Sequence, residues 1–142
     1  MRVMFVGDIN LGEYYTAFGH GPRTYSEKND IFESVREVLS EADLVAGNLE
    51  APITNHAFNP RRVESAVLRG NPKHANLLSS AGFKILQVAN NHTVQHGPEG
   101  FLETVETLRD LDIQPIGIAN QNLVKLEIGS QTVGFLAASD VA

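Results

Sequence analysis

Three short polar motifs, each at the end of an apolar run, contain the side chains of this sequence that could do chemistry. The apolar runs are residues 2–7, 43–47 and 84–88. The polar residues at or just after their ends are Asp8, Asn48, Glu50, Asn91 and His92. Carboxylate and amide oxygens together with an imidazole are ligands of hard or borderline divalent metals. The pattern therefore points to a metal site, provided that the fold brings the three motifs together.

Strands and loops are the elements that must position these residues. The apolar runs are rich in the branched side chains that favour strands. After His92, residues 97–99 begin a helical pattern with Pro98 near the first turn and Glu99 at the positive helix end. Asn91 and His92 are thus predicted on a loop between a buried strand and a helix, where open parallel sheets bind ligands. The alternative is that Asn and His are ordinary turn formers.

Composition limits the function classes. The 142 residues suit one domain with a real core, and 42% hydrophobic and 20% charged residues are typical of soluble globular proteins. A net charge of -6 argues against a nucleic-acid partner, and the absence of cysteine excludes disulfides, thiolate zinc sites and cysteine nucleophiles. No apolar segment approaches the roughly 20 residues of a membrane span. We expect a cytoplasmic location for the chain as given, or an extracytoplasmic one if a leader or anchor has been removed.

The remaining pattern alternates helices and strands. Helices are predicted at residues 31–42 after an Asp30 cap, at 72–80 after an Asn71 cap with a stop at Gly82, and at 98–111. A strand at 113–118 contains Pro115, which favours an edge position. Residues 123–128 and 132–137 flank Gly129-Ser130 and predict a β-hairpin.

Two long irregular segments separate these elements. Residues 9–30 contain several aromatic side chains, which favour an ordered loop beside the pocket. The second segment contains or adjoins Arg61, Arg62 and Arg69, the only local concentration of positive charge. Guanidinium groups suit phosphate or carboxylate, so Arg61 and Arg62 are candidates for substrate binding. The alternative is a solvated charged loop.

Four histidines lie outside the motifs, and we expect them at the surface or in loops. They are His20, His56, His74 and His96. His96 is a weak site candidate because it is close to His92 in sequence.

Residues 6–9, 47–54 and 89–93 together resemble the bacterial capsule-synthesis family of the CapA type, which is linked to poly-γ-glutamate synthesis. The fold of that family is similar to that of calcineurin-like metallophosphoesterases. The resemblance runs through the whole chain and implies an α/β fold, a sandwich of two β-sheets flanked by helices. Residues 1–142 would then form a single domain, the N-terminal half of this fold, truncated at the C-terminus.

The resemblance also assigns roles to the motif residues. Asp8 matches the first metal-ligand Asp of the phosphoesterases, and Asn91 matches their Asn ligand. Asn48 stands where many of them have the Asp that bridges two metals, and Glu50 belongs to the family's own Asn-Leu-Glu motif. His92 matches the His that assists the leaving group. The expected cofactor is a divalent metal (Mn, Mg or Zn), which would activate water and polarise a phosphoryl or acyl oxygen.

Three features of this sequence depart from the phosphoesterase pattern. Asn10 stands where a His ligand is common, Asn48 is neutral, and Gln95 stands where this family often has an Asp. One metal is therefore expected rather than two, and Asn10 is retained as a weak substrate-binding candidate.

Two hypotheses follow from these observations. The first is a metal-dependent hydrolase acting on an anionic small molecule or polymer. The second is a non-catalytic binding or scaffold module of a polymer synthesis or export complex. Membrane association is expected only through a segment absent from this sequence. Because the last strand ends on Ser139-Asp140, which should begin another loop at the same edge, we expect a fragment with negligible turnover and some self-association.

Overall fold

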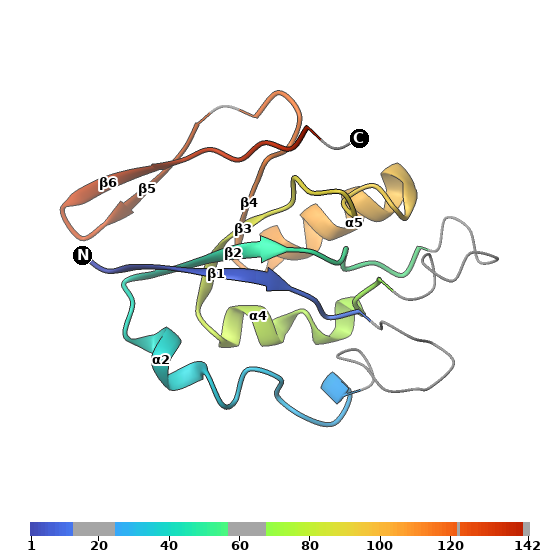
Figure 1. Ribbon diagram of the computed structural model, residues 1–142, viewed down its shortest axis with the longest axis horizontal. Coiled ribbons are helices and arrows are strands. Elements are labelled where there is room, and N and C mark those ends of the chain that lie inside the picture. The colour runs from blue at the N-terminus through green and yellow to red at the C-terminus, as the bar shows by residue number, and fades with distance from the viewer. Residues whose placement is uncertain (13–24, 57–67, 122, 141–142) are drawn as a thin grey trace.

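A four-stranded parallel sheet forms the centre of the computed structural model, which describes residues 1–12, 25–56, 68–121 and 123–140 (Figure 1). The strand order is β1-β2-β3-β4. The strands are β1 (Val3–Ile9), β2 (Leu44–Leu49), β3 (Phe83–Gln87) and β4 (Gln114–Ile116). All neighbours in this sheet are parallel, as the site hypothesis requires. Pro115 lies in β4 at the sheet edge, which confirms the position that the sequence predicts.

Helices connect the parallel strands. They are α2 (Arg36–Ser40), a 3-10 turn at Pro72–His74, α4 (Asn76–Ser80) and α5 (Gly97–Asp110). The Asn71 side chain accepts a hydrogen bond from the Lys73 backbone N–H at 3.1 Å, as expected of a cap. Gly82 follows α4 with φ of 91°, the left-handed conformation that glycine adopts without strain.

The helix predicted at residues 31–42 is wrong over its first half, because residues 31–35 form turns and α2 begins only at Arg36. The Asp30 carboxylate accepts from the Phe32 backbone N–H at 2.9 Å and also pairs with the Arg36 guanidinium. This local turn directs the Phe32 ring into the core, where its centroid lies 5.5 Å from that of Phe83. Burial of the aromatic ring therefore outweighs the helical periodicity.

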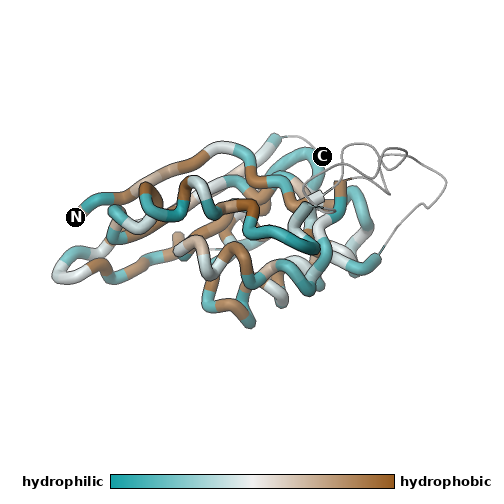
Figure 2. Tube along the Cα trace, turned by 90° about the horizontal axis from the view of Figure 1, so that it is seen from below, coloured by the Kyte–Doolittle hydropathy of each residue, from teal (hydrophilic) through white to brown (hydrophobic). Residues whose placement is uncertain are grey.

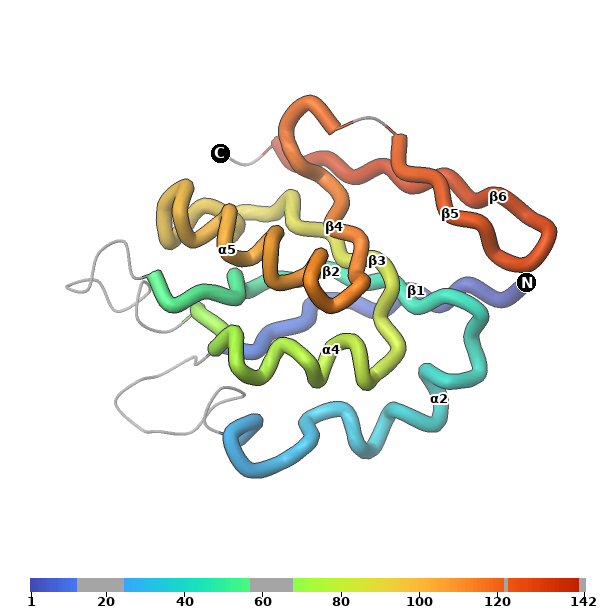
Figure 3. The backbone as a smooth tube through the Cα atoms, turned by 180° about the vertical axis from the view of Figure 1, so that it is seen from behind, coloured from blue at the N-terminus to red at the C-terminus, as the bar shows by residue number. Residues whose placement is uncertain are grey.

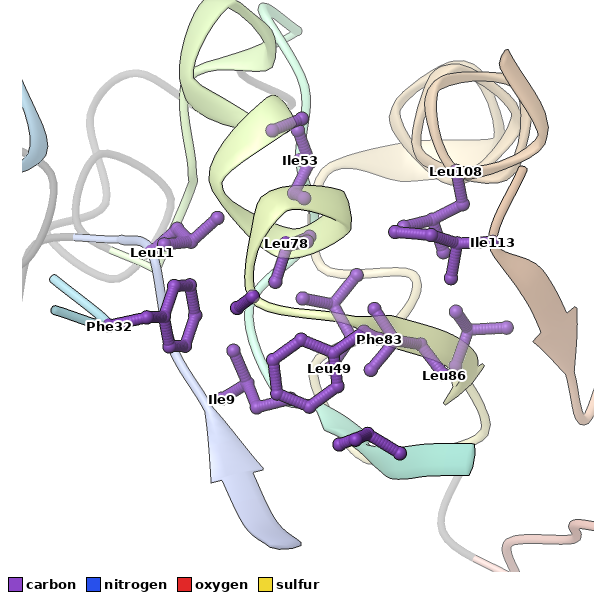
Figure 4. Packing of buried hydrophobic residues seen from close by; sticks show 14 of the residues in the cluster. Ile9, Leu11, Phe32, Leu49, Ile53, Leu78, Phe83, Leu86, Leu108 and Ile113 are labelled. Atoms are coloured by element: carbon purple, nitrogen blue, oxygen red, sulfur yellow. The ribbon is translucent and has the colours of Figure 1, made fainter. Parts of the chain in front are cut away.

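The larger core lies between the sheet and the helices (Figure 4). Phe32 and Leu39 contribute from the segment before β2, Leu78 from α4 and Leu108 from α5. These side chains pack on strand residues such as Leu86 and fix the height of each helix above the sheet.

A β-hairpin covers the other face of the sheet. It consists of antiparallel β5 (Val124–Ile128) and β6 (Gln131–Phe135), joined at Gly129, whose φ is 61°. Figures 1 and 3 place the hairpin on the side of the sheet opposite to α2 and α4. It packs on a smaller apolar cluster that includes Leu44 and Ile85. The fold is therefore α/β with a second, two-stranded sheet, as predicted.

Cover of this second face is incomplete. Phe5 of β1 stays 70% exposed although its ring centroid lies 6.4 Å from that of Phe135.

Apolar and polar stretches alternate along the trace in Figure 2. Within the described residues, no helix combines the length and the apolar character that a membrane crossing requires.

Candidate functional site at the carboxyl edge of the sheet

The polar endings of β1, β2 and β3 meet at one edge of the sheet. Asp8 pairs in register with Asn48, and Asn48 with Gln87, so the residues that follow these strands share that edge. A pocket of about 690 Å³ lies there. Its lining residues are Asp8, Asn48, Glu50, Gln87, Ala89, Asn90, Asn91, Ala138, Ser139 and Asp140. The four predicted metal-ligating residues therefore all line one pocket.

The Asn48 side chain lies between two carboxylates. Its Nδ2 donates to Asp8 Oδ1 and to Glu50 Oε2, each at 2.8 Å. Its Oδ1 accepts from Asn90 Nδ2 at 3.1 Å. If the Asn48 amide were rotated by about 180°, its oxygen would face both carboxylates and could donate a hydrogen bond to neither. The Asn48 amide thus bridges the two acids, and its two N–H groups offset part of the repulsion between them.

Asn90 joins the loop after β3 to the end of β2, and the sequence motifs did not single it out. Besides Asn48, its Nδ2 donates to the Leu49 carbonyl at 2.9 Å. Its Oδ1 accepts from the His92 backbone N–H at 2.9 Å, and its own N–H donates to Thr93 Oγ1 at 3.0 Å. The sequence feature that could have identified Asn90 is its position just after a strand, where Asn and Asp side chains commonly order turns.

His92 contacts Glu50, which lines the pocket, but His92 itself is not part of the lining. Its Nε2 is 3.2 Å from Glu50 Oε1 and 3.0 Å from Asn91 Nδ2. Its Nδ1 is 2.6 Å from Gln95 Oε1. The imidazole is therefore held at both ring nitrogens, and Glu50 and Asn91 connect it to the pocket.

The remaining candidates lie elsewhere. Asn10 is absent from the pocket lining; its Oδ1 accepts from the Gly12 N–H at 2.7 Å, while its buried Nδ2 has no partner within the described part of the chain. Arg61 and Arg62 fall outside the described residues.

His96 lies in the turn before α5, in agreement with the expected loop position, but it is only 1% exposed, so the alternative of a surface position is wrong. Its Nε2 is 2.9 Å from the Leu68 carbonyl. Burial lowers the pKa of His96, and the nearby Arg69 charge acts in the same direction. The imidazole is a packed structural group, so its closeness to His92 in sequence does not make it part of the pocket.

The chain returns to this pocket after the hairpin. Ser139 and Asp140 follow β6 and line the same pocket as Asp8. This agrees with the expectation that the polar ending of the last strand belongs to the same edge. Asp140 adds a third carboxylate to the lining, from the opposite end of the chain.

The chemical types of these donors fit a hard divalent cation, since carboxylates and amide oxygens converge on the pocket. In the arrangement observed, Asp8 and Glu50 share the Asn48 amide as their donor. Across the described ranges, no three or more His, Asp or Glu side chains form a ready-made cation cluster. An ion here would need amide oxygens in addition to the acids.

Comparison with known proteins shows the family. The family described as "Bacterial capsule synthesis protein PGA_cap" matches residues 2–142. The "PGA biosynthesis protein CapA" of Bacillus subtilis (strain 168) is 27% identical over 150 residues, which cover 100% of this chain and 38% of the relative. The "Capsule biosynthesis protein CapA" of Bacillus anthracis is 24% identical over 147 residues, 99% of this chain and 35% of the relative. The chain thus spans well under half the length of these relatives, and it belongs to the bacterial capsule synthesis family PGA_cap.

Proposed function

We propose that this protein acts in the synthesis of an anionic capsule polymer such as poly-γ-glutamate, through a metal-dependent site of the phosphoesterase type at the carboxyl edge of its sheet. The family and the names of its relatives support the capsule part of the proposal. The chemistry of the pocket supports the metal-dependent part.

The charge of the pocket lining carries the proposal. Asp8, Glu50 and Asp140 supply three carboxylates, and the lining contains no Lys or Arg from the described segments. An anionic phosphoester or polymer that enters this pocket meets charge of its own sign. A divalent cation removes this repulsion. Asp8, Glu50 and the side-chain oxygen of Asn91 are the groups that would hold Mn²⁺, Mg²⁺ or Zn²⁺. Asn48 would join them with its amide turned over, so that Oδ1 takes the place of Nδ2 beside the two acids.

A bound cation of this kind would supply a Lewis acid and an activated water. The protein's own residues would position the carboxylates and the imidazole of the site. Asn48 holds the Asp8 and Glu50 carboxylates at a fixed separation. Gln95 and Glu50 hold His92 at its two ring nitrogens, and His92 is the residue that would protonate the leaving group. Arg61 and Arg62 remain proposed contacts for an anionic substrate.

Two measurements on the 142-residue chain test this proposal. Calorimetric titration with Mn²⁺ should show one site, which Asp8→Ala removes. Asp110→Ala is the matched control, because Asp110 is an exposed acid at the end of α5, outside the pocket. The second measurement is hydrolysis of nitrophenyl phosphate esters with Mn²⁺, which should be negligible in this chain, as expected from its sequence, and should appear in a chain extended to the length of its relatives. Mn²⁺ heat that is equal in Asp8→Ala and wild type would contradict the proposed site.

A second function, a binding module without turnover, is favoured by one observation. The neutral Asn48 occupies the position between Asp8 and Glu50, so the lining lacks the carboxylate that would hold two metals together. Under this alternative, short γ-glutamyl oligomers bind in a Mn²⁺-dependent and saturable way while no phosphate ester is hydrolysed. Hydrolysis that is lost in Asp8→Ala would exclude it.

A further inference from the structure

Helix α5 contacts both loops that carry the site residues. The loop after β3, with Asn91 and His92, leads directly into its first residue, Gly97. The loop after β2, with Glu50, lies against its side through residues 53–55. The Glu50–His92 contact of 3.2 Å therefore joins two segments that share this one helix.

Thr104 is the buried contact between α5 and the β2 loop. Its Oγ1 accepts from the Ile53 backbone N–H at 3.1 Å, and it lies 3.1 Å from the Ile53 carbonyl and 2.7 Å from the Gly100 carbonyl. A hydroxyl has one proton and two lone pairs, so it satisfies the Ile53 N–H while it donates to a carbonyl. Because Thr104 is 3% exposed and Ile53 fully buried, water cannot replace this contact.

Glu103 forms a second contact one residue earlier. Its carboxylate accepts from the Thr54 hydroxyl, from the Asn55 N–H at 2.8 Å and from Asn55 Nδ2 at 3.0 Å. Burial by itself would raise the pKa of Glu103, but the hydrogen bonds from Thr54 and Asn55 outweigh it and hold the pKa below its usual value. The carboxylate is therefore ionised at neutral pH and binds the loop through charged acceptors.

Gly100 permits this close approach. A Cβ at position 100 would lie 2.8 Å from His96 Cβ and 3.4 Å from Thr54 Cγ2. A larger residue would clash with His96, at the start of α5, and would fill the space against Thr54. Gly100, Glu103 and Thr104, within little more than one turn of α5, thus all lie against the β2 loop.

We infer that Thr104 is a positioning residue for the Glu50–His92 pair. By accepting from the Ile53 backbone N–H, it fixes the β2 loop on α5 and so sets where the Glu50 carboxylate meets the imidazole. Glu103 adds to this effect from the exposed side. The inference rests on the proposed function only in treating Glu50 and His92 as parts of the same site.

The test compares Thr104→Val, which removes the hydroxyl at nearly constant shape, with Thr104→Ser, which keeps it. The ring ¹⁵N and ¹H resonances of His92, assigned from the spectrum of His92→Gln, are recorded at one fixed pH. Thr104→Val should shift these resonances, and Thr104→Ser should restore them. Mn²⁺ affinity should fall about tenfold in Thr104→Val, the lower end of the usual effect of residues that orient metal ligands, and stay near wild type in Thr104→Ser.

Thr107→Val controls for loss of a hydroxyl on the same helix, because the Thr107 side chain forms no hydrogen bond with the β2 loop within the described residues. If Thr104→Val does not fold, Glu103→Gln should produce a smaller shift of the same His92 resonances. Unchanged His92 resonances in folded Thr104→Val, or an equal change in Thr107→Val, would overturn the inference. Absence of Mn²⁺ binding in wild type would instead count against the proposed function, while the His92 resonances still decide the role of Thr104.

Discussion

The two edges of the parallel sheet each bear a pocket of similar size but of different chemistry. The pocket at the carboxyl edge has about 690 Å³, and one at the amino edge, beneath the hairpin, has about 620 Å³. The amino-edge lining combines Lys84 and Arg109 with the acids Asp43, Asp112 and Glu127. All charged residues of the carboxyl-edge lining are acids, within the described residues.

The acids at the two edges also have different partners. At the amino edge, Asp43 accepts from the Arg2 backbone N–H at 2.6 Å, and Glu127 accepts from the Thr132 hydroxyl at 2.7 Å. These contacts stabilise the fold. At the carboxyl edge, Asp8 and Glu50 share the neutral Asn48 amide, Glu50 also contacts His92, and the described lining contains no Lys or Arg. The two pockets have similar volumes. What distinguishes the carboxyl edge is the negative charge of its acids, which no Lys or Arg in the described lining balances.

The largest expected difference between the edges is in cation binding. Glu50→Gln should weaken Mn²⁺ binding by at least about 100-fold, since it removes a charged ligand, whereas residues that only orient ligands cost about 10–100-fold. Asp112→Asn, the matched change in the amino-edge pocket, should leave the affinity within about twofold because it is not a ligand. Calorimetry on both variants measures this. Equal losses would mean that Mn²⁺ binds without regard to site.

The next difference is in stability. Asn90→Ala removes the donor that the Asn48 amide oxygen and the Leu49 carbonyl share. The free energy of unfolding should therefore be about 1–3 kcal/mol lower than in wild type. Within the described residues, the Gln114 side chain at the amino edge donates only to the carbonyl of its neighbour Pro115. Gln114→Ala should therefore lower the free energy of unfolding by less than about 1 kcal/mol. Urea unfolding measures both, and the account fails on this point if Gln114→Ala is the more destabilising change.

Acid should loosen the carboxyl edge first. The folded-state pKa of His96 lies below its ordinary value of 6.5 and that of Glu103 below its ordinary value of 4.5, so in both cases the unfolded chain binds protons more readily. Their stabilisation is complete above these values and is lost as pH falls through the folded pKa. Hydrogen-exchange protection of the Ile53 amide should therefore fall between pH 7 and pH 5 more than that of Leu44.

His96→Gln cannot titrate in this range, so its protection at Ile53 should change less between pH 7 and pH 5. The same loss of protection in His96→Gln and wild type would show that another group controls the acid response.

The smallest effect is expected at an exposed ion pair of the amino edge. Arg2 Nη1 lies 2.7 Å from Glu41 Oε2, with both side chains more than half exposed. Arg2→Ala should change the free energy of unfolding by no more than about 1 kcal/mol, as for most surface pairs, and should leave Mn²⁺ affinity unchanged. Urea unfolding and calorimetry check the two parts, and a change in Mn²⁺ affinity would show that the edges are coupled.

The sequence could predict the strands and the shared edge because both depend on local pattern. Apolar runs that stop on Asp8, Asn48 and Asn91 determine where the parallel strands end, and parallel pairing then brings these ends together. Even Ser139-Asp140 could be assigned to the same edge by this rule.

The contacts among side chains could not be predicted in the same way. The roles of Asn90 and Thr104 depend on which loop lies beside them, which no periodicity encodes. The sequence also failed at Phe32, because burial of its ring against Phe83 replaced the first half of a helix by turns. His96 was misplaced for the same reason, since a loop from residue 68 covers it.

Anomalous diffraction from a crystal of this chain soaked in Mn²⁺ tests the central claim most directly. The account predicts one strong anomalous peak in the carboxyl-edge pocket, within coordination distance of Asp8 and Glu50, and none at the amino edge. In an Asp8→Ala crystal treated identically the peak should disappear. A peak beside Asp43 and Asp112 instead, or one in the carboxyl-edge pocket that survives in Asp8→Ala, would contradict the assignment of the site.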